Sequence, residues 1–231
     1  MTGDKTDVDK FLGELREEAE KLKSLRFYDG IISTVMELNS NPAHFIWELL
    51  QNAEDAEATY ITFILGQEAL MVVHNGRDFT KEDVKSICNI GDSSKKAKDS
   101  NKIGKFGIGF KSVFNYTSTP SIHSGEFSFA IHEYFSPHPL NAQRKGETLI
   151  VLPFDNPKKS KEKAFEEISI KLQTISSASL LFLKNIQEIK VNIESRPEEI
   201  KEFCITREVL SSRSIPDNPN LVFEEIKMKD Y

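Results

Sequence analysis

The chain has 231 residues, a formal net charge of −6 and 39% hydrophobic residues, a balance typical of a globular domain. No apolar run approaches the ~18 residues that a membrane-spanning helix needs, and the polar first ten residues lack the apolar region of a secretion signal. Cys88 and Cys204 are too few for a disulfide framework or a zinc site. The acidic balance argues against nucleic-acid binding through this segment. We expect a cytoplasmic protein with no membrane contact.

Helical periodicity marks the first part of the chain. Apolar residues recur at three- and four-residue steps over 8–26 and predict an amphipathic helix. A second helix is predicted over 30–38 and ends at the breaker 39–42. Pro42 then opens a third helix, because proline is favoured in a first helical turn.

The third predicted helix carries a polar face of functional interest. At 100° per residue, Glu48, Asn52 and Asp55 lie opposite the apolar sector and stack along one face. Such a face is most often only solvated. Asn, however, is a poor helix-interior residue, its amide oxygen suits Mg²⁺, and a glutamate one turn earlier can activate water. The apolar sector is formed by Phe45, Ile46, Leu49, Leu50, Ala53 and Ala56.

Strands and further helices follow in alternation. A hairpin turn is expected at 66–68, and Pro137 and Pro139 indicate a loop. Residues 91–102 are rich in Ser, Lys and Asp and predict a mobile polar loop, and the pattern weakens after Pro197. Trp47 and Met71 are expected in the core. Strands are predicted over 59–65, 70–73, 148–152 and 186–193, a hairpin over 121–132, a loop over 74–78, helices over 81–90, 110–115 and 161–175, and a buried apolar run over 180–183.

A glycine-rich segment, Gly104-x-x-Gly107-x-Gly109, opens one of these helices. Glycines let backbone N–H groups approach phosphate, and a helix N-terminus favours an anion. A dinucleotide-binding fold requires a strand directly before such a segment, and none is predicted here. The segment is not a Walker A loop either. Alone, the pattern is equally compatible with a mobile glycine-rich loop. The flanking lysines, Lys105 and Lys111, either approach phosphate or remain solvated, and solvated lysines are the commoner outcome.

The order of these motifs is more specific than any one of them. Glu48-x-x-x-Asn52-x-x-Asp55-Ala56, a Gly76 turn after a strand, the glycine-rich segment and Gly146-x-Thr148 follow one another. This order resembles the ATP-binding domain shared by DNA gyrase, the ninety-kilodalton heat-shock chaperones, histidine kinases and MutL, the GHKL superfamily. Over about 42–152 the phrases resemble the sacsin-type branch, at Glu48-Leu-Leu-Gln-Asn-Ala-Glu-Asp-Ala56, His74-Asn-Gly-Arg-Asp-Phe-Thr80, Ile90-Gly-Asp-Ser-Ser-Lys95 and Ile103-Gly-Lys-Phe-Gly-Ile-Gly-Phe-Lys-Ser-Val113.

The resemblance implies an α+β fold, a two-layer α/β sandwich of Bergerat type, in which a mixed, mostly antiparallel sheet carries helices on one face. It implies a GHKL-type ATP-binding domain over 1–195, with 196–231 as the start of a following domain or a C-terminal extension. Its activity would be Mg²⁺-dependent ATP hydrolysis without a covalent intermediate. Residues 91–109 would close as a lid over the nucleotide. The implied partners are ATP and ADP, a homodimer formed on nucleotide binding, and the other domains of a longer chaperone-like or defence-related protein.

Carried over residue by residue, the resemblance assigns roles to the motif residues. Glu48 would orient or activate the attacking water, and Asn52 would hold Mg²⁺ against the phosphates. Gly76 would let the backbone approach adenine, and Thr148 would support the adenine contacts from its strand. The implied nucleotide-binding residues are Asn52, Asp55, Ala56, His74, Asn75, Gly76, Ser93, Ser94, Lys95, Gly104, Lys105, Phe106, Gly107, Ile108, Gly109, Phe110 and Thr148.

The second motif departs from the family pattern. An aspartate usually begins it and recognises the adenine amino group, but His74 stands in that place. A neutral imidazole nitrogen can accept the hydrogen bond, although less strongly than a carboxylate. Asp78 is a second candidate, and His74 is equally well explained as a strand-end residue with a satisfied hydrogen bond.

Two alternative functions stay open. A histidine-kinase-type phosphotransfer domain needs a phospho-acceptor histidine on a dimerisation helix, and residues 8–26 contain no histidine. A nucleotide-binding scaffold without turnover shares all the binding motifs. Phosphate release by the wild type and by Glu48→Ala distinguishes that scaffold from an ATPase.

Overall fold

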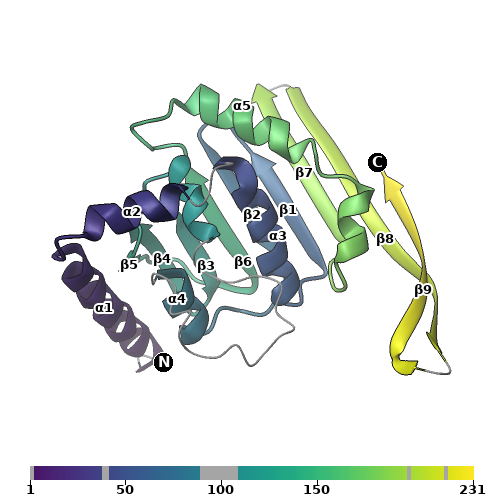
Figure 1. Ribbon diagram of the computed structural model, residues 1–231, viewed down its shortest axis with the longest axis horizontal. Helices are drawn as coiled ribbons and strands as arrows, with labels where there is room; N and C mark the ends of the chain where they lie inside the picture. Colours follow the sequence, from purple (N-terminus) through teal and green to yellow (C-terminus); the bar gives the residue numbers. More distant parts are fainter. Residues whose placement is uncertain (1–2, 38–41, 89–108, 197–198, 216–217) are drawn as a thin grey trace.

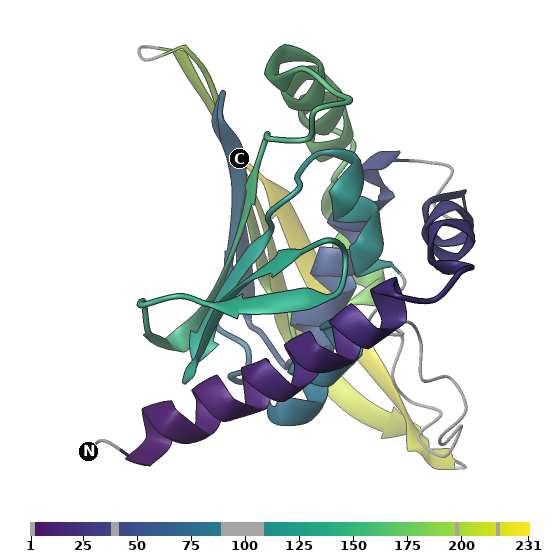
Figure 2. The same cartoon turned by 90° about the vertical axis from the view of Figure 1, so that its left-hand side faces the viewer.

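The computed structural model describes residues 3–37, 42–88, 109–196, 199–215 and 218–231. They form an α+β fold in which helices cover one face of a nine-stranded sheet (Figures 1 and 2). The strand order is β5-β4-β3-β6-β2-β1-β7-β8-β9. Neighbouring strands pair antiparallel except β1 and β7, which run parallel. The predicted mixed, mostly antiparallel sheet with a helical layer is therefore confirmed.

Most elements follow the predicted order along the chain, and the strands β5, β8 and β9 are additions to it. The helices are α1 (Gly3–Lys23), α2 (Tyr28–Glu37), α3 (Phe45–Asp55), α4 (Lys81–Cys88) and α5 (Lys161–Leu172), with 3₁₀ helices η1 (Pro42–His44), η2 (Phe110–Asn115) and η3 (Ser177–Phe182). The strands are β1 (Tyr60–Leu65), β2 (Ala69–His74), β3 (Ser121–Gly125), β4 (Phe127–His132), β5 (Ser136–Pro139), β6 (Arg144–Pro153), β7 (Glu188–Arg196), β8 (Glu199–Ile215) and β9 (Asn218–Asp230).

The core lies between the sheet and the helices because each contributes one apolar face. Alternate residues of β1, namely Ile61, Phe63 and Leu65, are fully buried. The apolar sector of α3 packs into the same core, and Phe45 and Ile46 have no exposed surface. This packing fixes α3 against the central strands, so its polar residues are held near the end of β2.

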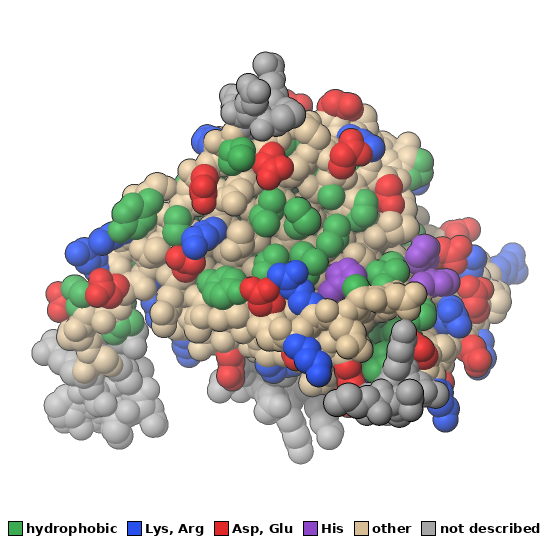
Figure 3. All heavy atoms as spheres, turned by 180° about the vertical axis from the view of Figure 1, so that it is seen from behind, with side chains coloured by type: hydrophobic (Ala, Val, Ile, Leu, Met, Phe, Trp, Pro, Cys, Tyr) green, Lys and Arg blue, Asp and Glu red, His purple; other side chains and the backbone are tan. Residues whose placement is uncertain are grey.

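The opposite face of the sheet is open, and Figure 3 shows apolar side chains gathered across its middle. Met71 lies on this face with 37% of its surface exposed, so its predicted place in the core is wrong. The cause is the alternation of β2, which points Leu70 and Val72 inward and Met71 outward. Trp47 is partly buried and packs against the core, as expected.

The loop predicted around Pro137 and Pro139 is instead strand β5. Proline lacks the N–H donor that a central strand needs, but β5 is the first strand of the sheet and pairs only with β4. An edge position tolerates proline. Helix α1 packs along this strand (Figure 1).

The segment after residue 196 continues the sheet. β8 pairs with β7 and β9 pairs with β8, both antiparallel, so the two strands form a long hairpin at the far side of the sheet from β5 (Figure 1). None of the described helices is long and apolar enough to cross a membrane.

Candidate functional site

The polar face predicted on the third helix is present on α3. Glu48, Asn52 and Asp55 are each partly exposed, while Leu49 and Ala53 between them are buried. The helix ends against the sheet, where the carboxylate of Glu54 accepts hydrogen bonds from the loop before β7. The amphipathic pattern thus places the three polar side chains along one accessible edge.

A narrow pocket opens beside this edge, between α3, the end of β2, α4 and η2. Its volume is about 10 Å³, which is room for about one water molecule. A larger ligand therefore enters only if the walls move apart. The lining residues are Leu49, Asn52, Ala56, His74, Arg77, Phe79, Asp83, Ile87, Phe110 and Ile150. Four of the predicted nucleotide-binding residues are among them: Asn52, Ala56, His74 and Phe110.

Asn52 presents an unpartnered acceptor at this pocket. Its Oδ1 atom is buried and has no hydrogen-bond partner in the described part of the chain. Buried amide oxygens are normally paired, and an unpaired one is unfavourable. A ligand or metal ion that binds this oxygen would remove that penalty.

Glu48 lies one turn before Asn52 and reaches the end of the glycine-rich segment. Its carboxylate occupies the space in which a side chain at Gly109 would begin, so a larger residue there would displace the Glu48 side chain. Its Oε1 atom also lies 3.7 Å from Nε2 of His44. The fold therefore brings the predicted base and the last glycine of the motif into contact.

His74 ends β2 and is almost completely buried, with 3% of its surface exposed. Its Nδ1 accepts a hydrogen bond from the backbone N–H of Gly76 at 3.2 Å. Burial lowers the pKa of His74 to about 4, because a charged imidazolium is poorly solvated there. The ring is therefore neutral at physiological pH.

Gly76 is required by the packing of the turn that follows β2. A Cβ atom at this position would lie 2.7 Å from the Cβ of Ala56 and 2.8 Å from its carbonyl oxygen. The next residue, Arg77, donates its backbone N–H to that same oxygen at 2.8 Å. Glycine here allows the turn to close against the end of α3, which explains its place in the motif without a ligand.

Asn75 faces away from the pocket. Its Oδ1 accepts the backbone N–H groups of Thr59 and Tyr60 at 2.9 and 3.1 Å, and its Nδ2 donates to the Thr59 hydroxyl. This predicted nucleotide-binding side chain instead joins the end of β2 to the start of β1.

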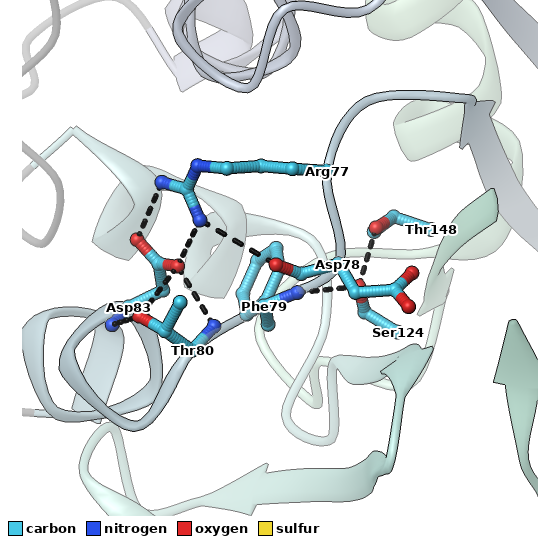
Figure 4. Close-up of polar contacts among 7 residues, drawn as sticks. All are labelled: Arg77, Asp78, Phe79, Thr80, Asp83, Ser124 and Thr148. Carbon is cyan, nitrogen blue, oxygen red and sulfur yellow. Dashed lines mark hydrogen bonds and ion pairs between the residues drawn. The ribbon is translucent and has the colours of Figure 1, made fainter. Parts of the chain in front are cut away.

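An ion pair that the sequence analysis missed forms one wall of the pocket (Figure 4). Arg77 donates two hydrogen bonds to the carboxylate of Asp83, at 2.5 and 3.1 Å, and Thr80 donates its N–H and hydroxyl to the same carboxylate. Burial raises the pKa of Asp83, but these bonds outweigh that effect and hold it below its usual value. Thr80-x-x-Asp83 is a capping-box spacing at the start of α4, a signal present in the sequence.

Thr148 supports the loop before α4 through the hydroxyl of Ser124. Its hydroxyl lies 2.6 Å from that of Ser124, which accepts the backbone N–H of Phe79 at 2.9 Å (Figure 4). Thr148 is buried and pairs with His74 across the strands β6 and β2. It therefore lies behind the pocket wall, as a supporting residue. Asp78, the second candidate for reading the base, does not line the pocket, and its side chain lies against Gly125.

Lys111 is not a solvated lysine. It is 1% exposed, and its ammonium donates to the backbone oxygens of Ile87 and Tyr134, each at 2.5 Å. Burial lowers its pKa to about 8. The lysine joins α4 to the turn between β4 and β5, and both of the outcomes expected for it, phosphate contact and solvation, are replaced by this structural role.

Several predicted residues cannot be placed. Ser93, Ser94, Lys95, Gly104, Lys105, Phe106, Gly107 and Ile108 lie outside the described residues, as does most of the predicted lid. In the described ranges, no group of three or more His, Cys, Asp or Glu side chains is arranged to hold a metal ion. The unpartnered Asn52 oxygen does fit Mg²⁺, because Mg²⁺ keeps several waters and takes few protein ligands when it also binds phosphates.

Comparison with known proteins places the chain in a family. A 99-residue stretch, 40% of this chain and 4% of its relative, is 44% identical to Protein NO VEIN of Arabidopsis thaliana. A 120-residue stretch, 44% of this chain and 2% of its relative, is 36% identical to human sacsin. The chain thus corresponds to a small fraction of either relative's length.

A solved structure, the N-terminal domain of a DNA repair protein, shares the fold. Its TM-score is 0.51 at 17% identity, over 71% of this chain and 53% of the other. This likeness concerns the fold alone. Residues 28–156, more than half of the chain, match the family described as the sacsin domain, and the chain therefore belongs to the sacsin domain family.

Proposed function

We propose that this chain is an ATP-binding module that hydrolyses ATP with Mg²⁺. It would act in a larger sacsin-like chaperone or defence protein, with closure of residues 91–109 over the nucleotide as the switch and a homodimer as the closed state. The proposal draws on the membership of the sacsin domain family, on the fold and on the arrangement of α3 beside the pocket.

The unpartnered Oδ1 of Asn52 is the observation that carries the proposal. This oxygen lines the pocket on the accessible edge of α3, beside the apolar side chains of Leu49 and Ile150. Buried amide oxygens are normally paired, so a donor or a metal ion that reached this one would be favoured. A hard oxygen in this position suits Mg²⁺ bound to phosphates.

Each site residue has its own role in the proposed reaction. Asn52 would hold the metal ion, which supplies charge stabilisation to the phosphates when bound. Glu48 would accept a proton from, or orient, the attacking water, since it lies one turn earlier on the same edge and touches Gly109. Phe110 and Ala56 would contact the nucleotide through their places in the pocket wall.

The narrowness of the pocket sets a requirement on this proposal. About one water molecule fits in it, so nucleotide binding must widen it. Trp47, the single tryptophan of the chain, lies on α3 but is not among the residues that line the pocket, and its ring lies beside the ammonium of Lys171 on α5. Binding is therefore best followed by calorimetry.

Phosphate release and calorimetric titration together test the proposal. The wild type should bind MgATP and release phosphate, Glu48→Gln should bind but turn over slowly, and Asn52→Ala should bind weakly. Gln51→Ala, one residue away on the same helix, is the matched control and should behave as the wild type. Binding without turnover in the wild type would favour the scaffold alternative, and absence of binding would refute the proposal.

A further inference from the structure

Strand β9 forms an open edge of the sheet. It pairs with β8 on one side, and it is the last strand in the order of the described sheet. Figure 1 shows no other described element beside its outer edge. A strand at an edge carries unpaired backbone N–H and C=O groups, with which another strand can pair. The side chains of β9 therefore decide what can pair there.

The backbone bonds to β8 show which groups of β9 point outward. Cys204 and Tyr231 exchange both bonds, with the Tyr231 N–H donating at 2.9 Å and the Cys204 N–H donating at 3.1 Å. Bonded pairs alternate with unbonded ones along an antiparallel ladder. In the register of β8 and β9, the backbone groups of Lys227 therefore point toward β8, and those of Ile226 and Met228 point outward.

The exposed side chains of β9 alternate in charge. Glu225 and Lys227 are exposed and share one face of the strand, while Ile226 between them is half-buried on the other face. An edge whose charges all had one sign would repel a second copy of itself, because like charges directly opposite one another are destabilising. Here both signs are present two residues apart, so the strand can be complementary to itself.

The outward backbone groups restrict how a second β9 can pair antiparallel with the first. When Ile226 faces Ile226 of the second copy, Glu225 lies opposite Lys227 twice, once on each side of the twofold axis. A shift that sets Ile226 opposite Met228 places Lys227 opposite Lys227, and the opposite shift places Glu225 opposite Glu225. A pairing centred on Met228 sets Lys227 against Lys229. Of these four registers, only the one centred on Ile226 pairs opposite charges and brings no like charges together over residues 225–229.

We propose that two copies of this chain pair edge to edge through β9, antiparallel about a twofold axis at Ile226, with Glu225 of each copy opposite Lys227 of the other. The contact is the same on both copies, so it closes at a dimer, and it joins two nine-stranded sheets into one. It uses no residue that lines the pocket. The dimer therefore forms without nucleotide and does not rest on the proposed function.

Sedimentation of the chain without nucleotide tests the inference. A short strand pair gives a small interface and weak association, so the protein is measured up to about 0.5 mM. The wild type should dimerise. Lys227→Glu places Glu opposite Glu twice and should raise the Kd of the dimer by about tenfold or more. Glu225→Lys combined with Lys227→Glu exchanges the two charges and should restore the dimer, although residue 227 carries the same substitution.

Lys158→Glu is the matched control, because Lys158 is an exposed lysine between β6 and α5, and it should dimerise as the wild type does. A monomeric wild type at the highest concentration, an unchanged Kd in Lys227→Glu, or no recovery in the double variant overturns the inference. A dimer that forms only with MgATP and is insensitive to Lys227→Glu also overturns it, while agreeing with the proposed function.

Amide hydrogen exchange of the wild type guards against variants that do not fold. The N–H groups of Ile226 and Met228 point outward, so they are protected by hydrogen bonds only in the dimer. Their exchange should slow as the protein concentration rises, whereas that of Lys227, whose N–H points toward β8, should change less. Exchange at Ile226 and Met228 that does not depend on concentration overturns the inference.

Discussion

Glu54 is the residue whose removal should most weaken the anchoring of α3. Its side chain is buried, with 5% of the residue exposed. The carboxylate accepts the backbone N–H groups of Lys184, Asn185 and Ile186 at 2.8–3.1 Å and the side-chain amide of Asn185 at 3.0 Å. These donors precede β7, the strand that pairs parallel with β1. One carboxylate thus ties the end of α3 to the sheet.

The magnitude follows from the number of donors. A hydrogen bond to a charged group contributes about 1.5–3 kcal/mol, but four donors share one carboxylate, and their contributions do not add. Removal of this buried acceptor leaves three backbone N–H groups without a partner, each of which costs about 1–3 kcal/mol. We therefore expect Glu54→Ala to lower the free energy of unfolding by about 3–5 kcal/mol. In a chain of this size that corresponds to a fall in Tm of roughly 6–20 °C.

Urea denaturation followed by circular dichroism is the assay. Glu54→Gln keeps a carbonyl oxygen for the donors that bond Oε1 but turns amide hydrogens toward the N–H of Ile186, so its loss should lie between those of the wild type and the alanine variant. Glu166→Ala, an exposed glutamate on α5, is the control and should stay within about 0.5 kcal/mol of the wild type. A loss of less than about 1 kcal/mol in Glu54→Ala would refute the reasoning, because the carboxylate would then not hold the loop.

Three further predictions concern the site. Glu48→Gln should slow phosphate release by ~10²–10⁴-fold while MgATP affinity stays within a few-fold; a wild-type rate removes the assigned role. Burial lowers the pKa of His74 to about 4 from ~6.5 in the unfolded chain, so the unfolded state binds the extra proton and stability is lost as the pH falls through this window. The loss between pH 7 and pH 5 should be about 2 kcal/mol, and urea titrations should find it reduced in His74→Phe; equal losses contradict the burial argument. Gly76→Ala should destabilise the fold by ~1–3 kcal/mol, because the added Cβ would overlap Ala56. The control Gly13→Ala, with no atom within 4 Å of the added Cβ, should be neutral or stabilising. Similar denaturation midpoints for the two variants would contradict the steric argument.

The helix that carries the site could be predicted because its signal is local. Leu49 and Ala53 recur at helical spacing and are buried, while Glu48, Asn52 and Asp55 remain on the other side, as the 100° projection requires. Strands β1 and β2 could also be predicted, because their alternation of apolar and polar side chains is a pattern among neighbouring residues.

Partners distant in the chain could not be predicted. Glu54 lies at the border of the apolar sector, and its donors are 130–132 residues away. Lys111 looks like any lysine beside a glycine motif, and only the fold shows that Ile87 and Tyr134 enclose its ammonium. Strand β5 was missed because proline argues against strands in general, and its edge position is a property of the sheet.

The polar wall of the pocket falls between these cases. The Thr80-x-x-Asp83 spacing predicts the start of α4. The ion pair of Asp83 with Arg77, however, depends on how the preceding turn closes. Similarly, His74 was recognised as a departure from the motif, whereas its tautomer depends on the N–H of Gly76. Chemistry at this pocket is therefore set by turn geometry as much as by residue type.

The most direct test of the account is calorimetric titration of the wild-type chain with ATP, once with Mg²⁺ and once with a chelator, alongside Asn52→Ala and the Gln51→Ala control. We predict one binding site with Mg²⁺, much weaker binding with the chelator, and weak binding by Asn52→Ala under both conditions, because the Asn52 oxygen is the proposed ligand of the metal. Gln51→Ala should match the wild type. Equal MgATP affinity in Asn52→Ala and the wild type, or no binding by the wild type, would contradict the claim that this pocket is a magnesium-dependent nucleotide site.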